Sequence, residues 1–431
     1  MKLFLQKLLK ISAKSILKKY HPEIIGITGS AGKTGAREAI YAVLSAKLKV
    51  RRNLKNYNNE IGVPLTVIGA ASPAKSIFGW IGVFSAALKL LLKKDKNYPK
   101  ILILEMAADK PGDMDYLTEM VKPNIGVITS IGDSHIENFG SLEKIKQEKS
   151  VLIRIIDENG RAVLNVDDRQ VKSLIKETKA KVLTYAIDSE AEISGKEMKL
   201  LFALSLEGKD KLGINFKLLN NHAFIPVFLP NVISKAGVYA ALAGAALGVI
   251  KGMNLVEISR AFKKYSPPNG RMKLLLGVKD TYIIDDTYNA SPAASILAVE
   301  TLAGIAKQSR ENKYAVFGDM LELGEFSQKK HEEVGRVIAK NKIDKLIVAG
   351  ERSRDIARGA IKAGMKEDNI FHFASAEEAG KFIQERIKSG DIILVKGSQG
   401  ARMEKVVKEI MAEPLRAKEL LVRQGKEWDD K

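Results

Sequence analysis

The sequence predicts an α/β protein with two open, mostly parallel sheets, and three observations lead to this fold class. Short apolar runs alternate with segments of helical periodicity, which is the pattern of doubly wound sheets. Polar residues follow several of these runs, at the sheet edge where such folds bind ligands. The break Pro267-Pro268-Asn269-Gly270 separates two regions that each show this alternation.

The 431 residues are sufficient for two or three domains, and the breaks predict three segments. Residues 1–22 form a basic amphipathic helix, residues 23–268 a central domain with a mostly parallel doubly wound sheet, and residues 269–431 a C-terminal Rossmann-like α/β domain. In the central domain we expect strands at 24–27, 101–105, 125–129 and 162–165, helices at 36–48 and 236–249, and a β-rich stretch at 181–228 with turns at 207–208 and 220–221. In the C-terminal domain we expect strands at 282–285, 314–317, 345–348 and 392–395.

The most informative segment lies between the first predicted strand and the helix that follows it. It contains Gly29, Ser30, Ala31, Gly32, Lys33 and Thr34. A glycine-rich turn in this position directs backbone N–H groups and a helix N-terminus at an anion. Lys33 would neutralise the β- and γ-phosphates of ATP, and the Thr34 hydroxyl would bind Mg²⁺. The general P-loop pattern needs glycine at position 27, where Ile27 stands, so a simple glycine-rich turn remains the alternative.

Composition and charge exclude several classes of site. The chain has no cysteine and five histidines. It therefore lacks disulfides, thiolate zinc sites and a cysteine nucleophile, in agreement with a reducing cytosol. The net charge of +19 and the pI near 9.6 favour anionic partners. We expect no nucleic-acid partner, because the lysines are dispersed and no nucleic-acid-binding module appears. A nucleotide-linked substrate or an anionic membrane surface explains the charge equally well.

Two segments, residues 1–20 and 77–96, have features of membrane contact. The first is a basic amphipathic helix, in which one face carries Leu5, Leu8, Leu9, Ile16 and Tyr20 and the opposite face carries Lys7, Lys10, Lys14 and Lys18. The second is mostly apolar and then meets Lys93, Lys94 and Lys96, but it is short for a transmembrane span. Two interpretations stay open: both helices pack on the protein's own core, or they make peripheral membrane contact.

Three titratable residues in the central domain are candidates for catalysis. Glu105 ends a predicted strand in the sheet of the glycine loop, where it is placed to hold Mg²⁺ between nucleotide and substrate. His135 follows another strand and serves as a metal ligand, a phosphate contact or a cap. Lys149 is by itself only a solvated lysine on a helix.

These motifs occur in one order along the chain, and together they resemble the Mur ligases of peptidoglycan synthesis. The similarity extends from about residue 23 to residue 410. It rests on 29–34, 58–64, Glu105-Met106, 111–113, His135 with 139–142, Gly270-Arg271-Met272, Asp285-Asp286-Thr287-Tyr288-Asn289-Ala290-Ser291-Pro292, 318–324 and 395–398. Within the family, the chain is most similar to the member that adds D-alanyl-D-alanine to a UDP-muramoyl-tripeptide.

The resemblance implies an ATP- and Mg²⁺-dependent amide ligase. A substrate carboxylate attacks the γ-phosphate, and the incoming amine then attacks the resulting acyl phosphate. By resemblance, Lys33 and Thr34 hold phosphate and one Mg²⁺, while Glu105 and His135 serve a second. Lys149 matches a lysine that the family carries as a carbamate, a carboxylate-like metal ligand.

The resemblance also assigns residues for the nucleotide and the substrates. Arg271 would reach the γ-phosphate, and Asp286, Tyr288 and Asn289 would contact nucleotide. Asn58 and Asn59 are expected to bind substrate. Asp319, Lys396 and Ser398 are candidates for the pocket of the amine, which is an amino acid or dipeptide.

The sequence departs from the family pattern in three places. Gly35 stands where a second hydroxyl residue usually follows Lys-Thr. Ala236, Gly237 and Ala240 replace the polar side chains of a His-Asn-x-x-Asn motif, which puts the adenine contacts in doubt. Only about 22 residues precede the first strand, so we expect no counterpart of the family's UDP-binding domain.

The predicted function is therefore a cytoplasmic ligase of cell-wall precursor synthesis, positioned at the inner face of the membrane if the two basic helices bind lipid. Two alternatives stay open. One is a Mur-like ligase with a different carboxylate acceptor, non-UDP or lipid-linked, or a different amino acid. The other is a nucleotide-binding homologue that no longer ligates.

Overall fold

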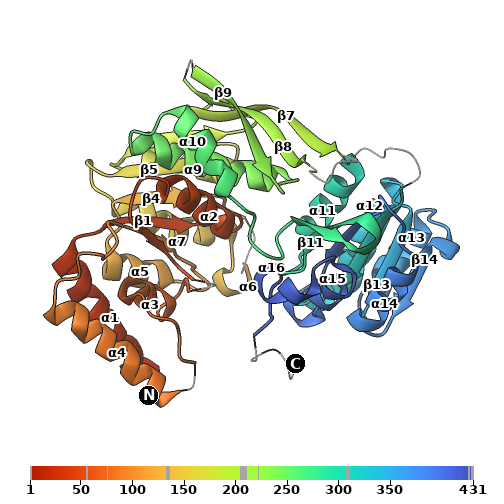
Figure 1. Cartoon of the computed structure of the whole chain (residues 1–431), viewed down its shortest axis with the longest axis horizontal. Coiled ribbons are helices and arrows are strands. Elements are labelled where there is room, and N and C mark those ends of the chain that lie inside the picture. Colours follow the sequence, from red (N-terminus) through yellow and green to blue (C-terminus); the bar gives the residue numbers. More distant parts are fainter. Residues whose placement is uncertain are drawn as a thin grey trace. The chain divides into compact units, whose positions relative to one another are not determined.

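The computed structural model describes residues 2–54, 57–74, 76–132, 136–203, 211–221, 223–305, 311–425 and 428. These residues form two compact units, and each contains a sheet with helices packed on its faces (Figure 1). The first unit comprises Met1–Lys199, Asn215–Leu229 and Lys235–Ser266, and the second comprises Leu200–Ile214, Pro230–Ser234 and Pro267–Lys431. The predicted α/β class, with a doubly wound first sheet and a Rossmann-like second one, is confirmed.

The first sheet has the strand order β2-β3-β1-β4-β5-β6-β7-β8-β9 among the described residues. All neighbouring pairs from β2 to β7 are parallel. The strands are β1 (Glu23–Thr28), β2 (Val50–Arg52), β3 (Ile101–Glu105), β4 (Ile125–Ile128), β5 (Arg161–Asn165), β6 (Lys181–Ala186), β7 (Ile193–Ala203), β8 (Lys211–Asn220) and β9 (Ala223–Pro230). The first unit's helices are α1 (Lys2–Tyr20), α2 (Lys33–Leu44), α3 (Gly62–Ile68), α4 (Ile77–Leu92), α5 (Asp113–Val121), α6 (Ile136–Phe139), α7 (Leu142–Arg154), α8 (Arg169–Ser173), α9 (Lys235–Ile250) and α10 (Leu255–Ala261).

The central strands read as almost continuous apolar runs because helices cover both of their faces. On one face, α7 approaches so closely that a Cβ atom on Gly26 would lie 2.7 Å from Leu152. On the other face, α2 packs against α9, and a Cβ atom on Gly244 would lie 3.0 Å from the backbone of Ala39. Small residues at these positions therefore set the distance between the layers.

The second sheet has the order β10-β11-β15-β12-β13-β14, and only β10 is antiparallel to its neighbour among the strand pairs described. Two apolar clusters lie on its two faces, one containing Phe317 and the other containing Val316. The strands are β10 (Lys273–Gly277), β11 (Thr281–Asp286), β12 (Lys313–Gly318), β13 (Lys345–Ala349), β14 (Ile370–Phe373) and β15 (Ile392–Lys396). The helices are α11 (Pro292–Gly304), α12 (Ser327–Lys340), α13 (Arg354–Lys362), α14 (Ala376–Arg386), α15 (Glu404–Ile410) and α16 (Ala417–Leu420).

Three predicted local features have different outcomes. The helix predicted at 36–48 is wrong at both ends, because α2 begins at Lys33, directly after the left-handed Gly32, and ends at Leu44. The predicted turn at 220–221 is confirmed, since Asn221 adopts a φ of 51° between β8 and β9. The predicted turn at 207–208 lies outside the described residues.

The N-terminal helix α1 packs its apolar face on the first unit. Leu9 and Ile16 are fully buried in the cluster that also contains α3, α5 and α7 residues. The apolar face of α1 therefore packs on the protein's own core, which is the first of the two interpretations left open by the sequence. Helix α4 differs, since only Val83 and Ala87 are buried along its length. No helix in the described part of the chain is both long and apolar enough to cross a bilayer.

Candidate active site

The glycine loop joins β1 to α2 in the geometry of an anion-binding turn. Gly29 and Gly32 have φ angles of 151° and 83°, which residues with a Cβ atom rarely adopt. Ala31 and Gly32 are exposed, so the loop backbone is accessible to a ligand. Lys33 is the first residue of α2, and its ammonium donates to the Gly29 carbonyl at 2.6 Å. The N–H groups at the start of a helix and the helix dipole favour negative charge at this point.

Residues after β4 hold the loop in place. The Ser30 N–H donates to the Ser130 carbonyl at 2.8 Å, and the Ala31 N–H donates to the Ser130 hydroxyl at 2.9 Å. The Thr129 hydroxyl donates to the Ala31 carbonyl at 2.5 Å. The site analysis from sequence missed Thr129 and Ser130 in this role, although their place directly after a predicted strand was a usable signal. These bonds use the N–H groups of Ser30 and Ala31 and fix the conformation of the loop backbone before any phosphate arrives.

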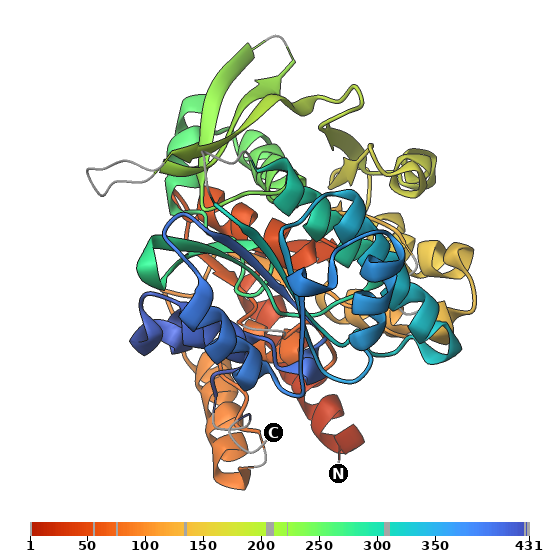
Figure 2. The same cartoon turned by 90° about the vertical axis from the view of Figure 1, so that its right-hand side faces the viewer.

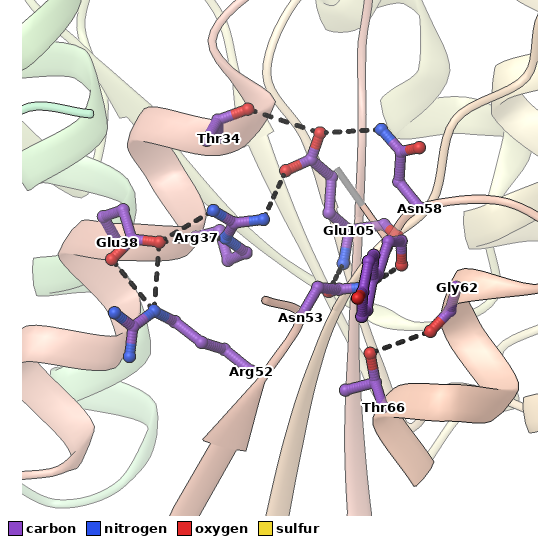
Figure 3. A network of polar contacts seen from close by, with 10 residues as sticks. Thr34, Arg37, Glu38, Arg52, Asn53, Asn58, Gly62, Thr66 and Glu105 are labelled. Carbon is purple, nitrogen blue, oxygen red and sulfur yellow. Dashed lines mark hydrogen bonds and ion pairs between the residues drawn. The ribbon is translucent and has the colours of Figure 1, made fainter. Parts of the chain in front are cut away.

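Glu105, at the end of β3, is the centre of a buried polar network (Figure 3). Its carboxylate accepts hydrogen bonds from the Thr34 hydroxyl at 3.3 Å and from the Asn58 side-chain amide at 3.1 Å. Its backbone N–H donates to the Asn53 side chain at 2.5 Å. The structure therefore brings together three predicted site residues, Thr34, Asn58 and Glu105. Asn59 lies beside them, and its side-chain oxygen accepts from the first N–H groups of α3.

A guanidinium that the sequence analysis did not single out also contacts Glu105. Arg37 is buried on α2, one turn after Lys33, and its Nη1 lies 3.1 Å from the Glu105 carboxylate. Arg37 also contacts Glu38 at 2.8 Å, and Glu38 in turn contacts Arg52 at 2.9 Å (Figure 3). The spacing of Thr34 and Arg37 on one helical face was the available signal. This ion-pair chain fixes the Glu105 carboxylate beside the glycine loop.

The residues around Glu105 fit a magnesium ion. Among the described residues there is no group of three or more histidine, cysteine, aspartate or glutamate side chains that would form an all-protein metal cage. Mg²⁺ commonly uses one or two protein oxygens and completes its shell with phosphate and water. The Thr34 hydroxyl and the Glu105 carboxylate, next to a phosphate-binding loop, supply such oxygens. His135, the other predicted ligand, lies outside the described residues.

Lys149 is an almost completely buried lysine in α7, with 2% of its surface exposed. Burial and, to a smaller extent, the nearby charge of Lys33 lower the pKa of its amine from 10.5 to about 8, against opposite effects of Asp109 and Glu148. A solvated lysine would show neither effect. The coupling to Lys33 places Lys149 near the glycine loop.

Two departures from the expected pattern contact one another. Gly35 is on α2 and Ala240 on α9, and a Cβ atom on Gly35 would lie 3.3 Å from the Cβ of Ala240. A hydroxyl residue at 35 and an asparagine at 240 would not both fit without a shift between the two helices. The two small residues therefore belong to one close helix contact.

The second unit collects the remaining predicted residues at the carboxyl ends of its parallel strands. Arg271 is exposed and lies over the ring of Tyr288, 4.0 Å from its centroid. Asp286 ends β11 and is buried, while Asn289 is exposed in the loop that follows. Asp319 follows β12 and accepts a hydrogen bond from the Ser353 N–H at 2.8 Å.

Lys396 ends β15 and Ser398 follows it, and both use their polar groups inside this unit. The Lys396 ammonium lies 2.6 Å from the Asp286 carboxylate and donates to the Asn289 carbonyl at 2.9 Å. The Ser398 hydroxyl accepts from the Leu321 N–H at 2.9 Å and donates to the Ala290 carbonyl at 3.3 Å. Both side chains fix the loop that carries Asn289. Their contact with the amine substrate stays a prediction.

Comparison with known proteins gives a family for this arrangement. Residues 85–224 match the Mur ligase middle domain, and residues 270–399 match the Mur ligase glutamate ligase domain. A Bacillus subtilis (strain 168) protein, UDP-N-acetylmuramoyl-tripeptide–D-alanyl-D-alanine ligase, is 30% identical over 94% of this chain and 79% of its own length. The chain belongs to the Mur ligase family. A Mycobacterium tuberculosis (strain ATCC 25618 / H37Rv) protein of the same name is 29% identical over 90% of this chain and 73% of its own length.

Solved Mur ligase structures share the fold. The MurF ligase from Thermotoga maritima, in complex with ADP, matches with a TM-score of 0.72 and 26% identity over 94% of this chain and 83% of its own. The MurF from Acinetobacter baumannii matches with a TM-score of 0.75 at 24% identity, over 94% of this chain and 79% of its own. The first of these places a nucleotide on a Mur ligase fold that this chain shares.

Proposed function

We propose that this Mur ligase uses ATP to join D-alanyl-D-alanine to a UDP-muramoyl-tripeptide, the reaction named for its Bacillus subtilis relative. The observation that carries the proposal is the first unit's site, where the glycine loop, Thr34, Glu105 and the buried Lys149 come together. These residues combine a phosphate-binding loop with a carboxylate that can bind Mg²⁺. A cytoplasmic location suits a cysteine-free enzyme that consumes ATP.

The chain's residues act by positioning and by neutralising charge. The N-terminal end of α2 and the Lys33 ammonium hold the phosphates, so that the γ-phosphorus is aligned with the substrate carboxylate. The carboxylate oxygen bonds to the γ-phosphorus, and ADP leaves with the electrons of the broken P–O bond. The dipeptide amine then bonds to the acyl carbon, loses its proton, and expels phosphate. Mg²⁺ supplies additional positive charge on the phosphate oxygens; Thr34 and Glu105 would hold it.

We further propose that Lys149 is a carbamate in the active enzyme, and its burial and lowered pKa support this role. Only the neutral amine attacks CO₂, forming an N–C bond and releasing a proton. A pKa near 8 leaves a sizeable neutral fraction at physiological pH. With ¹³C-bicarbonate, wild-type protein should show a carbamate resonance that Lys149→Arg lacks. A spectrum without this resonance would remove the carbamate.

A ligation assay tests the main proposal. Purified protein, ATP and Mg²⁺ are incubated with UDP-muramoyl-tripeptide and D-alanyl-D-alanine, and both phosphate release and the new amide are measured. We expect phosphate release that requires both substrates and is lost in Lys33→Met. Lys47→Met, a matched substitution at an exposed ion pair on the same unit, should keep it. Release with a different acceptor or amine, but not with this pair, would contradict the proposed substrates.

We also propose contact with a membrane surface through residues 1–20 and 77–96. The arrangement of α1 and α4 indicates which of their side chains make this contact.

A further inference from the structure

Helix α4 exposes an apolar face that no described residue covers. Val83 and Ala87 point into the first unit, and the opposite sector of the helix carries five large apolar side chains that are 55–87% exposed. These are Ile77, Phe78, Ile81, Leu88 and Leu92. At 100° per residue they fall within a sector about 100° wide, which is the breadth of a helix face built to be covered. A contiguous apolar patch of this kind marks an interaction surface.

The charge around this face is mostly positive. Neither α1 nor α4 contains an aspartate or glutamate, and Asp95 is the only acidic residue from 76 to 100. Lys89 is exposed at the border of this sector, and exposed Lys93, Lys94 and Lys96 follow the helix. Lys7 and Lys18 are exposed on α1. An anionic surface complements this arrangement.

Helix α4 is held in a fixed position beside α1. The Lys19 ammonium donates to the carbonyls of Leu90 and Leu91 at 2.9 and 2.7 Å, and the Tyr20 hydroxyl donates to Leu90 at 3.0 Å. Both helices run in the same direction, and their N-terminal ends project from the same side of the first unit (Figures 1 and 2). Leu3 and Phe4 are exposed at the free end of α1. The two ends thus present apolar side chains on the same side of the first unit.

We propose that the exposed apolar sector of α4, together with Leu3 and Phe4 at the free end of α1, forms a face that docks on an anionic lipid bilayer. The apolar sector of α4 lies in the headgroup region, and the lysines lie over anionic headgroups. The roughly 24 Å length of a 16-residue helix suits a surface-lying element. The sector with large exposed side chains is the part that enters the lipid, and the lysine stems extend to the phosphates. Two copies of this face would oppose basic charge to basic charge, so a lipid surface is the better occupant than a second copy. The apolar face of α1 is buried in the domain core, so α4 supplies most of the insertion.

Co-sedimentation of the full chain with vesicles tests this docking independently of ligase activity. Wild-type protein should bind phosphatidylglycerol-containing vesicles more tightly than pure phosphatidylcholine vesicles, and the difference should shrink as salt is raised. A double variant, Phe78→Glu with Ile81→Glu, should bind on the order of a hundredfold more weakly, because two inserted side chains are lost. Circular dichroism and gel filtration confirm that the variant is folded.

Two matched controls replace exposed apolar residues elsewhere by the same charge. Phe224→Glu and Leu415→Glu change residues that are 63% and 99% exposed, and both should bind vesicles as the wild type does. Equal loss in the controls would reduce the effect to net charge and overturn the proposal. So would wild-type protein that stays in the supernatant, or a wild-type dimer in gel filtration that Phe78→Glu converts to monomer. The ligation assay is run without vesicles on the wild type and the double variant. Its result tests the proposed function alone, whereas vesicle binding tests the docking proposal alone.

Discussion

Replacing Lys149 by methionine should stabilise the first unit while it abolishes ligation. The Lys149 pKa falls from 10.5 to about 8 on folding, a difference of about 2.5. This corresponds to about 3 kcal/mol by which burial destabilises the ammonium form. Methionine has a similar shape and no charge, so it removes this cost. A gain in stability together with a loss of activity is expected of a lysine kept for chemistry rather than for folding.

The pH dependence follows from the direction of the shift. Below about pH 8 both folded and unfolded chains carry the ammonium, so the full cost applies. Between about pH 8 and 10.5 the folded chain has lost this proton while the unfolded chain keeps it, and wild-type stability rises. The advantage of Lys149→Met should therefore be greatest below pH 8 and vanish near pH 10.5. Groups common to both proteins cancel in the comparison.

Urea unfolding followed by tryptophan fluorescence measures the difference. The chain has two tryptophans, so a Trp428→Phe background leaves Trp80, which packs on the core of the first unit, as the probe. Buffers without bicarbonate keep Lys149 as a free amine. A Lys149→Met protein that is less stable at pH 7, or that still ligates, would refute the reasoning.

Three further substitutions test the contacts that build the sites. Arg37→Met leaves the buried Glu105 carboxylate without its guanidinium and should lower unfolding stability by about 3 kcal/mol without Mg²⁺; an unchanged Tm in thermal unfolding argues against this. Gly244→Leu forces a side chain against the Ala39 backbone and should cost about 2 kcal/mol or more in urea unfolding, whereas wild-type stability would show that α2 and α9 can separate cheaply. Lys396→Met should lower the stability of the second unit by about 3 kcal/mol, because the Lys396–Asp286 pair is buried; calorimetry showing an unchanged second transition would disprove this.

The sequence predicted the fold because its signals are local. Continuous apolar strands, a glycine loop between strand and helix, and one proline-glycine break are each visible in a short window. The start of α2 was missed, since the left-handed Gly32 starts the helix three residues before its apolar pattern becomes regular. Helix patterns alone do not distinguish α1, whose apolar face is buried, from α4, whose apolar face is exposed, because tertiary packing decides which face is covered.

The candidate site was predictable where a residue's chemistry lies next to a motif. Thr34 and Glu105 come together as their positions at strand and helix ends imply. The spacing of Thr34 and Arg37 indicated that both lie on one face of α2, but the contact of Arg37 with Glu105 was not predictable, because it depends on the distance between α2 and β3. For Lys149, the family resemblance supplied the residue, and its burial in the folded chain supplies the lowered pKa that supports a chemical role.

Isotope transfer during ligation tests the central claim most directly. The UDP-muramoyl-tripeptide is prepared with ¹⁸O in the reacting carboxylate and is incubated with ATP, Mg²⁺ and D-alanyl-D-alanine. Because that carboxylate's oxygen bonds to the γ-phosphorus and leaves with it, each released phosphate should carry one ¹⁸O atom. Phosphate without ¹⁸O, or no phosphate release in the presence of both substrates, would contradict ligation through an acyl phosphate by this chain.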